Sequence, residues 1–233
     1  MQHFLIPYPL QKGPLRIDEK ELLHQMRDVL RFRVGQECML LDGEGKKALA
    51  TVEALNRKEA ELQVSDVETG PAPKRALRLI FALPKKPATL EFILQKGTEL
   101  GVTDFFPIIS ERTQVHQLRQ VDRLKRIVKE ALEQSEGLYL PTLHDMRTLQ
   151  DILLDLPTGL LLAGEPWKYK KKLGEIIKPV NEDLNLLIGP EGGLSDLELK
   201  ELEGVGAQLF LLGETVLRME TAAIAALSVV QFS

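Results

Sequence analysis

The sequence predicts an α/β fold with a mainly parallel sheet over the last two thirds of the chain, preceded by a smaller domain that is mostly β. From Leu77 onward, short apolar runs alternate with helical patterns, which is typical of parallel strands joined by crossover helices. Before residue 70, apolar residues instead recur with a period of two. Between these patterns lie Gly70, Pro71 and Pro73, so we predict a boundary there, with domains at residues 1–70 and 74–233.

The first domain is expected to contain one helix followed by three strands. The helix covers residues 19–30, with Asp18 as its cap. The strands follow at residues 37–41, 48–54 and 60–67, and residues 42–45 form a turn after the first of them.

The second domain is expected to alternate strands and helices along its whole length. The expected strands are residues 77–83, 104–109, 159–165, 184–188 and 209–212. An amphipathic helix lies between the first two of these strands and ends at Gly101. A second amphipathic helix covers residues 121–134, after the second strand. Ser195 followed by Glu198 is a capping box, and Thr221 can cap an Ala-rich helix near the end of the chain. A lysine run within residues 168–172 is typical of a solvated helix.

Composition favours a water-soluble protein without structural metal or disulfides. None of the apolar runs approaches the roughly 20 residues that a membrane span requires, and the first residues lack the regions of a signal peptide, so we expect a cytoplasmic protein and no membrane. Cys38 is the only cysteine and the four histidines are scattered, which predicts no metal site. Because the net charge is −4, any contact with nucleic acid must come from a local basic patch.

Two glycine-containing loops follow predicted strands at the place where ligands bind in open α/β sheets. The first contains Gly189, Glu191 and Gly193, and the carboxylate inside it would repel a phosphate. A neutral or cationic ligand, or one that donates hydrogen bonds, therefore suits it better. The second loop contains Arg218 and Glu220 between apolar residues. The simpler alternative is a tight turn with one exposed acid in the first loop and a surface ion pair in the second.

Together the two loops resemble the signature of the RsmE family. The resemblance rests on residues 187–193, Leu-Ile-Gly-Pro-Glu-Gly-Gly, combined with Leu212-Gly213 and with Val216, Leu217, Arg218, Glu220, Thr221 and Ala222. Further matches occur at Lys86, at residues 99–102 and at residues 110–112. Three positions depart from the family pattern, namely His3 and Gln25, where the family has Arg and His, and Gly137, where it has Arg.

The resemblance implies an S-adenosylmethionine-dependent methyltransferase of the SPOUT class that modifies N3 of a uridine in 16S ribosomal RNA of the 30S subunit. It also implies a C-terminal trefoil knot, an N-terminal β-barrel similar to PUA domains that holds RNA, and a homodimer. Alternatives are another SPOUT enzyme, acting on transfer RNA or on ribose 2′-O, and a non-catalytic RNA-binding protein. A dehydrogenase of the Rossmann type is disfavoured, because the chain lacks the G-x-G-x-x-G fingerprint.

Residue roles follow from the same resemblance. Arg218, Glu191 and Glu220 are the expected catalytic group, in which Arg218 stabilises an anion or orients a phosphate, Glu191 acts as base or holds the nucleoside, and Glu220 orients Arg218. Backbone groups are expected to hold S-adenosylmethionine at Leu162, Ala163, Gly164, Ile188, Gly189, Leu212, Gly213, Leu217 and Met219. RNA contacts are expected from Arg27, Arg31, Lys86 and Arg112, and Lys85 stands beside Lys86 at the same strand end.

Overall fold

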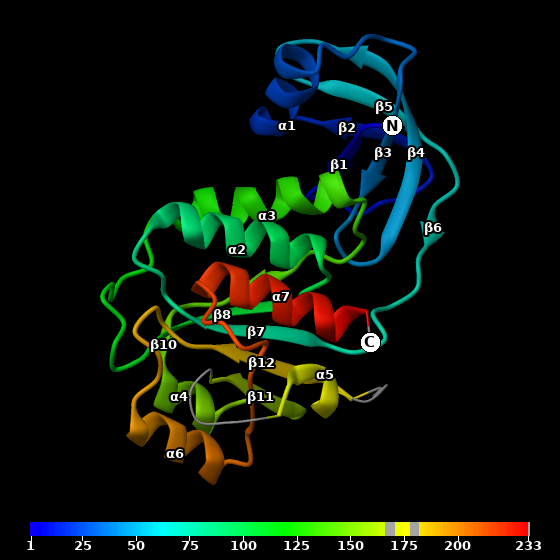
Figure 1. The fold of residues 1–233 in the computed structure, drawn as a ribbon. Coiled ribbons are helices and arrows are strands. Elements are labelled where there is room, and N and C mark those ends of the chain that lie inside the picture. The colour runs from blue at the N-terminus through cyan, green and yellow to red at the C-terminus, as the bar shows by residue number, and fades with distance from the viewer. Residues whose placement is uncertain (166–170, 178–181, 233) are drawn as a thin grey trace. The chain divides into compact units, whose positions relative to one another are not determined.

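The computed structural model describes residues 1–165, 171–177 and 182–232 (Figure 1). The chain divides into two compact units. The N-terminal unit comprises Met1–Ala72 and Leu132–Leu140, and the C-terminal unit comprises Pro73–Ala131 and Pro141–Ser233. The predicted linker coincides with the division between Ala72 and Pro73. The sequence analysis placed only this one boundary, so it did not assign Leu132–Leu140 to the N-terminal unit. Of the lysine run, residues 168 and 170 lie outside the described residues.

The N-terminal unit is built on a six-stranded mixed sheet. Its strands are β1 (His3–Leu5), β2 (Gly13–Ile17), β3 (Glu37–Leu41), β4 (Lys46–Leu55), β5 (Ala60–Val64) and β6 (Glu68–Thr69). The order is β1-β3-β4-β5-β2, β6 pairs with β4, and only β1–β3 is parallel. The three predicted strands are confirmed, and their inward side chains meet a core of their own that includes Phe4, Ile17, Leu22, Met26 and Leu62.

The predicted helix of this unit has a different start and a different second half. The α-helix α1 covers Lys20–His24 and continues as a π-helical turn, η1 (Gln25–Val29). Its N-cap is Glu19, which makes no side-chain cap, so the expected role of Asp18 was wrong. The carboxylate of Asp18 instead accepts a hydrogen bond of 2.7 Å from the Tyr8 hydroxyl, a partner that local sequence does not reveal. Beyond η1, Arg31 adopts a left-handed conformation with φ of 55°, which prevents the helix from continuing.

The C-terminal unit contains a seven-stranded sheet in which every pairing is parallel. The strands are β7 (Leu77–Ala82), β8 (Asp104–Ile109), β9 (Thr142–Leu143), β10 (Arg147–Thr148), β11 (Leu160–Gly164), β12 (Leu184–Ile188) and β13 (Gln208–Phe210). Their order is β10-β8-β7-β12-β11-β13, and β9 pairs with β8. The predicted parallel sheet is confirmed. Because neighbouring strands run the same way, the carboxyl ends of β7, β11, β12 and β13 share one edge.

Six helices accompany this sheet in the described part of the unit. They are α2 (Pro87–Glu99), α3 (Val121–Ser135), α4 (Leu149–Leu154), α5 (Leu173–Ile176), α6 (Asp196–Gly204) and α7 (Met219–Gln231), and the end of α3 belongs to the N-terminal unit. Helices α2 and α7 lie side by side, and α7 also packs against β12 (Figure 1). No helix among the described residues is both long enough and apolar enough to cross a bilayer.

The start of α7 differs from the prediction. The helix begins at Met219 with Arg218 as its N-cap, and the amide of Ala222 donates to the Arg218 carbonyl oxygen at 2.8 Å. Thr221 therefore lies in the first turn and does not cap the helix. The consequence is that Arg218 stands at the junction of a loop and a helix start, where backbone N–H groups are free to meet a ligand.

Candidate active site

The first glycine loop is a tight turn between β12 and α6. The amide of Gly193 donates to the carbonyl oxygen of Pro190 at 2.8 Å, and Gly193 has a φ of +71° that L side chains rarely adopt. Immediately after it, Ser195 caps α6. Its side chain accepts from the Glu198 amide, and the Glu198 carboxylate accepts from the Ser195 amide at 2.8 Å, so the predicted capping box is confirmed. The turn leaves Glu191 exposed at its tip.

The second loop joins β13 to α7. It covers residues 211–218 and leads into the first turn of α7, where Met219 is buried and Glu220 is half-buried. Arg218, at the N-cap, is exposed. The loop therefore places a cation and a carboxylate at the start of the same helix.

Both loops open into one cavity of about 730 Å³. It is also lined by Gly164 at the end of β11 and by Glu165 directly after it. Lys85 and Lys86, between β7 and α2, and Thr89, in the first turn of α2, complete this part of the wall. Its walls thus come from four parallel strand ends. Its volume is within the range of about 300–1,000 Å³ that is usual for small-molecule sites. The two glycine loops, 24 residues apart from Gly189 to Gly213 in the sequence, meet at one concave surface.

Most of the predicted site residues line this cavity. They are Glu191, Arg218 and Glu220 of the catalytic set, Lys86, and Gly164, Ile188, Gly189, Leu212, Gly213, Leu217 and Met219 of the cofactor set. Leu162 and Ala163 do not line it, since both are fully buried inside β11. A Cβ added to Gly213 would meet no atom within 4 Å, so this glycine borders open space beside the cavity.

Glu191 is held from the neighbouring strand end. Its Oε1 accepts a hydrogen bond of 3.2 Å from the amide of Lys85. This hydrogen bond fixes the position of Oε1 and thereby restricts the orientation of the whole Glu191 carboxylate. The loop after β7 therefore helps to orient the acid of the glycine loop.

In the described part of the chain, no ion pair between the two side chains supports the expectation that Glu220 orients Arg218. The physical reason is helical geometry, because residues two apart at a helix start do not face each other. The two side chains line the same cavity separately.

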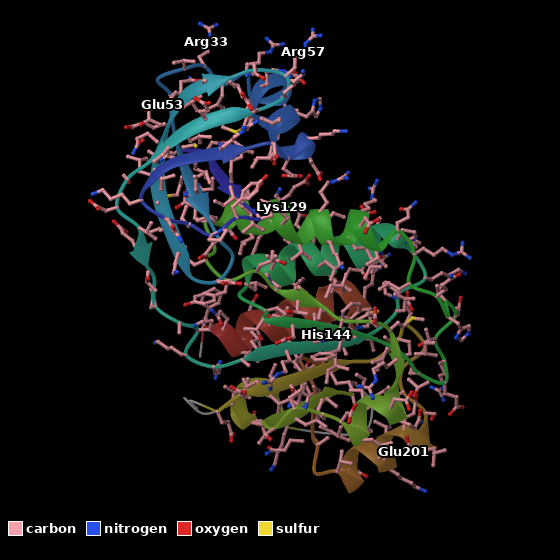
Figure 2. The ribbon with its side chains drawn as sticks, turned by 180° about the vertical axis from the view of Figure 1, so that it is seen from behind. Arg33, Glu53, Arg57, Lys129, His144 and Glu201 are labelled. Atoms are coloured by element: carbon pink, nitrogen blue, oxygen red, sulfur yellow. The ribbon has the colours of Figure 1, made fainter. Side chains whose placement is uncertain are left out.

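Two of the four residues expected to contact RNA, Arg27 and Arg31, lie in the N-terminal unit and differ in their contacts. Arg27 makes two hydrogen bonds, of 2.7 and 2.6 Å, to the carboxylate of Asp28, which also contacts His24 at 2.9 Å. The pairing with Arg27, followed by that with His24, lowers the pKa of Asp28. The charge of Arg27 is therefore largely offset. Arg31 is exposed, and the nearby Arg33 projects outward from the N-terminal unit (Figure 2).

Sequence reasoning did not find three further residues of the cavity wall. Thr89 lies in the first turn of α2, Gln114 lies in the loop after β8, and Glu165 follows β11 with only 4% of its surface exposed. The position of Glu165 directly after Gly164 was the available signal, because a polar residue after a buried strand sits at the ligand edge. Gln114 carries no such local signal. No group of three possible metal ligands occurs among the described residues.

Comparison with known proteins matches both parts of the chain. A family model described as RNA methyltransferase domain matches residues 71–231, and one described as RNA methyltransferase PUA domain matches residues 17–65. A ribosomal RNA small subunit methyltransferase E from Synechocystis is 33% identical over 238 residues, covering 97% of this chain and 77% of that protein.

Two solved structures are similar over nearly the whole chain. One is a ribosomal RNA small subunit methyltransferase E from Neisseria gonorrhoeae bound to S-adenosyl methionine, with a TM-score of 0.91, 30% identity and coverage of 100% of this chain and 97% of that chain. The other is a putative methyltransferase from Legionella pneumophila with bound SAM, with a TM-score of 0.89, 30% identity and coverage of 99% and 96%. With its domain model matched over residues 71–231, this chain belongs to the RNA methyltransferase family that includes the ribosomal RNA small subunit methyltransferases E.

Proposed function

We propose that the protein transfers a methyl group from S-adenosylmethionine to N3 of a uridine in 16S ribosomal RNA of the 30S subunit. The observation that carries this proposal is the meeting of the two glycine loops at one cavity, with Glu191 and Arg218 in its wall. Membership of the RNA methyltransferase family and likeness to SAM-bound proteins support the choice of donor.

The cavity suits a nucleoside joined to an amino acid. Its wall is rich in glycine and in backbone groups at strand ends, which can approach a ligand closely and donate or accept hydrogen bonds. Glu165, Glu191 and Glu220 add carboxylates that complement a positively charged sulfur. Once bound, S-adenosylmethionine supplies a methyl group that is already activated for in-line displacement.

The chain's own residues must then position the uridine and handle one proton. N3 carries a proton in the neutral base, so Glu191 removes it as the N3–carbon bond forms and the carbon–sulfur bond breaks. Arg218 stabilises the negative charge that develops on the uracil ring. The contact from the Lys85 amide keeps the Glu191 carboxylate at the cavity edge during this step.

Replacement of Arg218 by alanine tests this assignment. Arg218→Ala should lower the rate of methyl transfer by about 10²–10³-fold, the usual cost of losing one stabilising donor. The fold and cofactor affinity should remain, because the side chain is exposed and makes no ion pair within the described chain. Single-turnover rates, circular dichroism and calorimetry measure the three quantities, with Lys200→Ala on α6 as the control. An unchanged rate would remove Arg218 from the mechanism.

Product analysis tests the substrate. Purified protein, labelled cofactor and 30S subunits that lack the modification should yield N3-methyluridine in digested 16S RNA. Label in ribose or in transfer RNA would support another enzyme of the SPOUT class. An absence of cofactor binding in calorimetry would support a non-catalytic RNA-binding protein.

We also propose that the last elements form a trefoil knot. Strand β11 lies between β12 and β13 in the sheet, yet α7, which follows β13, packs against β12 and α2. The segment between β13 and α7 therefore crosses from the β13 edge of the sheet past β11 to β12, and we take this crossing in support of a threaded chain.

The remaining expectations concern RNA, assembly and location. We propose that the N-terminal unit, which matches the PUA model, holds RNA through Arg31 and Arg33, while Lys86 contacts a phosphate at the cavity. We further propose a homodimer that works in the cytoplasm. Exposed apolar side chains of the C-terminal unit, including Leu197, Val205 and Val216, support self-association. Sedimentation at several concentrations tests the dimer.

A further inference from the structure

A short turn after β8 is fixed by its own side chains. The amide of Ser110 donates to Thr113 Oγ1 at 2.9 Å, the two hydroxyls lie 2.9 Å apart, and the amide of Thr113 donates to the Ser110 carbonyl oxygen at 3.0 Å. Both residues are buried. The turn therefore presents Glu111 and Arg112 in a defined orientation.

Arg112 lies against the first glycine loop. Its Nη1 donates to the carbonyl oxygen of Gly192 at 2.9 Å. A Cβ added to Gly192 would lie 3.4 Å from Arg112 Cβ and 3.6 Å from its Cδ, so the stem of the arginine packs on the loop backbone as well. The guanidinium is thus engaged by the loop that carries Glu191.

Glu198 holds the same two segments together from the inside. Only 2% of its surface is exposed. Its Oε2 accepts from the Ser195 amide at 2.8 Å, and its Oε1 accepts from the Glu111 amide at 2.8 Å. One buried carboxylate therefore serves both as the partner in the helix cap and as a bridge to the turn after β8. Removing a buried acceptor leaves an amide donor unsatisfied, which is costly.

We propose that Arg112 and Glu198 are positioning residues for methyl transfer, and that they act by fixing residues 189–195 against the turn at residues 110–113. This inference rests on the proposed function, since it concerns how Glu191 is placed for that reaction. It replaces the expectation that Arg112 binds an RNA phosphate. A displacement of about 1 Å in an active site can cost about 10²-fold in rate.

The two roles of Arg112 make different predictions for Arg112→Met, which keeps the length of the stem and removes the donors. If Arg112 braces the loop, cofactor affinity measured by calorimetry without RNA should fall, and the single-turnover rate should fall by about 10²-fold. The affinity for RNA and its salt dependence should stay unchanged. If Arg112 instead contacts a phosphate, RNA affinity falls, the salt slope decreases by about 1, and cofactor binding is unaffected. That second result would overturn the proposal.

Glu198→Gln provides an independent test with little change of shape. The amide group replaces one acceptor oxygen by a donor, so it opposes one of the two backbone amides. The expected result is a lower single-turnover rate, with faster amide hydrogen exchange in residues 189–195 and 110–113 alone. Glu201→Gln, one turn further along α6, is the matched control, because the Glu201 carboxylate accepts a hydrogen bond of 3.0 Å from the exposed side-chain amide of Gln150. Glu201 is labelled in Figure 2. A rate equal to that of this control would overturn the role of Glu198.

The double variant shows whether the two residues act on one loop. Effects on the transfer rate should be less than additive, since either change alone already releases the loop. Strict additivity would contradict a shared brace. Failure of the proposed function is distinguished by the unmodified protein, which would then transfer no methyl group, whereas the exchange and cofactor-binding changes would still report on the brace.

Discussion

Gly137 occupies a place where a larger residue would have to displace a buried neighbour. A Cβ there would lie 2.5 Å from Leu132 Cδ1, and the Gly137 amide donates to the Leu132 carbonyl oxygen at 3.0 Å at the end of α3. Glycine at position 137, where the family has arginine, therefore lets the chain pack closely against Leu132 at the end of α3. Gln25 is also explained, because its side-chain amide donates to Glu133 Oε2 at 3.2 Å within the N-terminal unit.

At the residue scale, the sequence predicted contacts between residues that are close along the chain, but not contacts between distant residues. The capping box of Ser195 and Glu198 could be predicted because its partners are three residues apart. The second contact of Glu198, with the Glu111 amide, joins residues 87 positions apart and depends on the folded sheet. For the same reason the hydrogen bond from Arg112 to the Gly192 carbonyl oxygen could not be predicted, since nothing near Arg112 in the sequence indicates this partner.

Gly97 allows a close approach that can be tested by one methyl group. A Cβ at this position would lie 2.6 Å from Phe105 Cε1 and 2.9 Å from its Cζ, and Phe105 is fully buried. We expect Gly97→Ala to lower the free energy of unfolding by about 1–3 kcal/mol through overpacking. Gly204→Ala on α6 is the control, because a Cβ there meets no atom within 4 Å. Denaturant unfolding measures both, and equal stability of the two variants would contradict this packing.

At the scale of elements, the accuracy of prediction followed the burial of each strand. Strands β7, β8, β11 and β12 were found because strands buried on both faces read as continuous apolar runs. Strands β1, β2, β9 and β10 were not, because they cover only two to five residues and lack a clear period. The start of α7 was placed three residues late because Thr221 is a good cap by type, while the cap used is Arg218.

Asp183 joins the beginnings of β7 and β12 and should make stability depend on acid pH. Its carboxylate accepts from the Ala76 amide and from Arg78 Nη2, both at 2.8 Å. The Ala76 hydrogen bond, followed by that of Arg78, lowers the pKa of Asp183. A lowered pKa in the folded state means that the contribution is complete above the ordinary pKa of about 3.9 and is lost as pH falls through the folded value.

The Asp183→Asn variant checks this dependence. Its free energy of unfolding should be lower than that of the parent protein at neutral pH, and the difference should shrink as the solution is acidified below pH of about 4. Chemical denaturation at a series of pH values gives both curves. Parallel curves across the whole range would show that the charge of Asp183 has no part in stability.

At the scale of the whole molecule, the sequence predicted two parts but not the full membership of each. The amphipathic pattern of α3 continues past residue 131 without a break, so nothing in it marks the point at which Leu132–Leu140 joins the N-terminal unit. The position of the cavity could be predicted, because glycine-edged strand ends converge in any parallel sheet. The proposed threading of the chain could not be predicted from residue spacing or composition, because neither indicates which segment passes through a loop formed by another.

The proposed knot predicts the length of the chain under tension. When both termini are pulled apart, an unknotted chain of 233 residues extends at about 3.3–3.6 Å per residue. A tightened knot should retain part of the chain and give a reproducibly shorter final length in single-molecule stretching. A variant truncated before α7, which lacks the threaded end, should reach the length expected from its residue number. Full extension of the intact protein would contradict the knot.

The carboxylate of Glu133, which accepts a hydrogen bond of 2.8 Å from the Leu5 amide, belongs to a stretch encoded some sixty codons downstream of residue 72. The N-terminal unit is therefore not encoded by one continuous segment of the gene. A gene fragment ending at residue 72 would encode a product without the stretch that covers Leu5 and Leu41, whereas grafting Leu132–Leu140 onto that fragment would restore it. Recombination that exchanges this unit between relatives has to carry both stretches together.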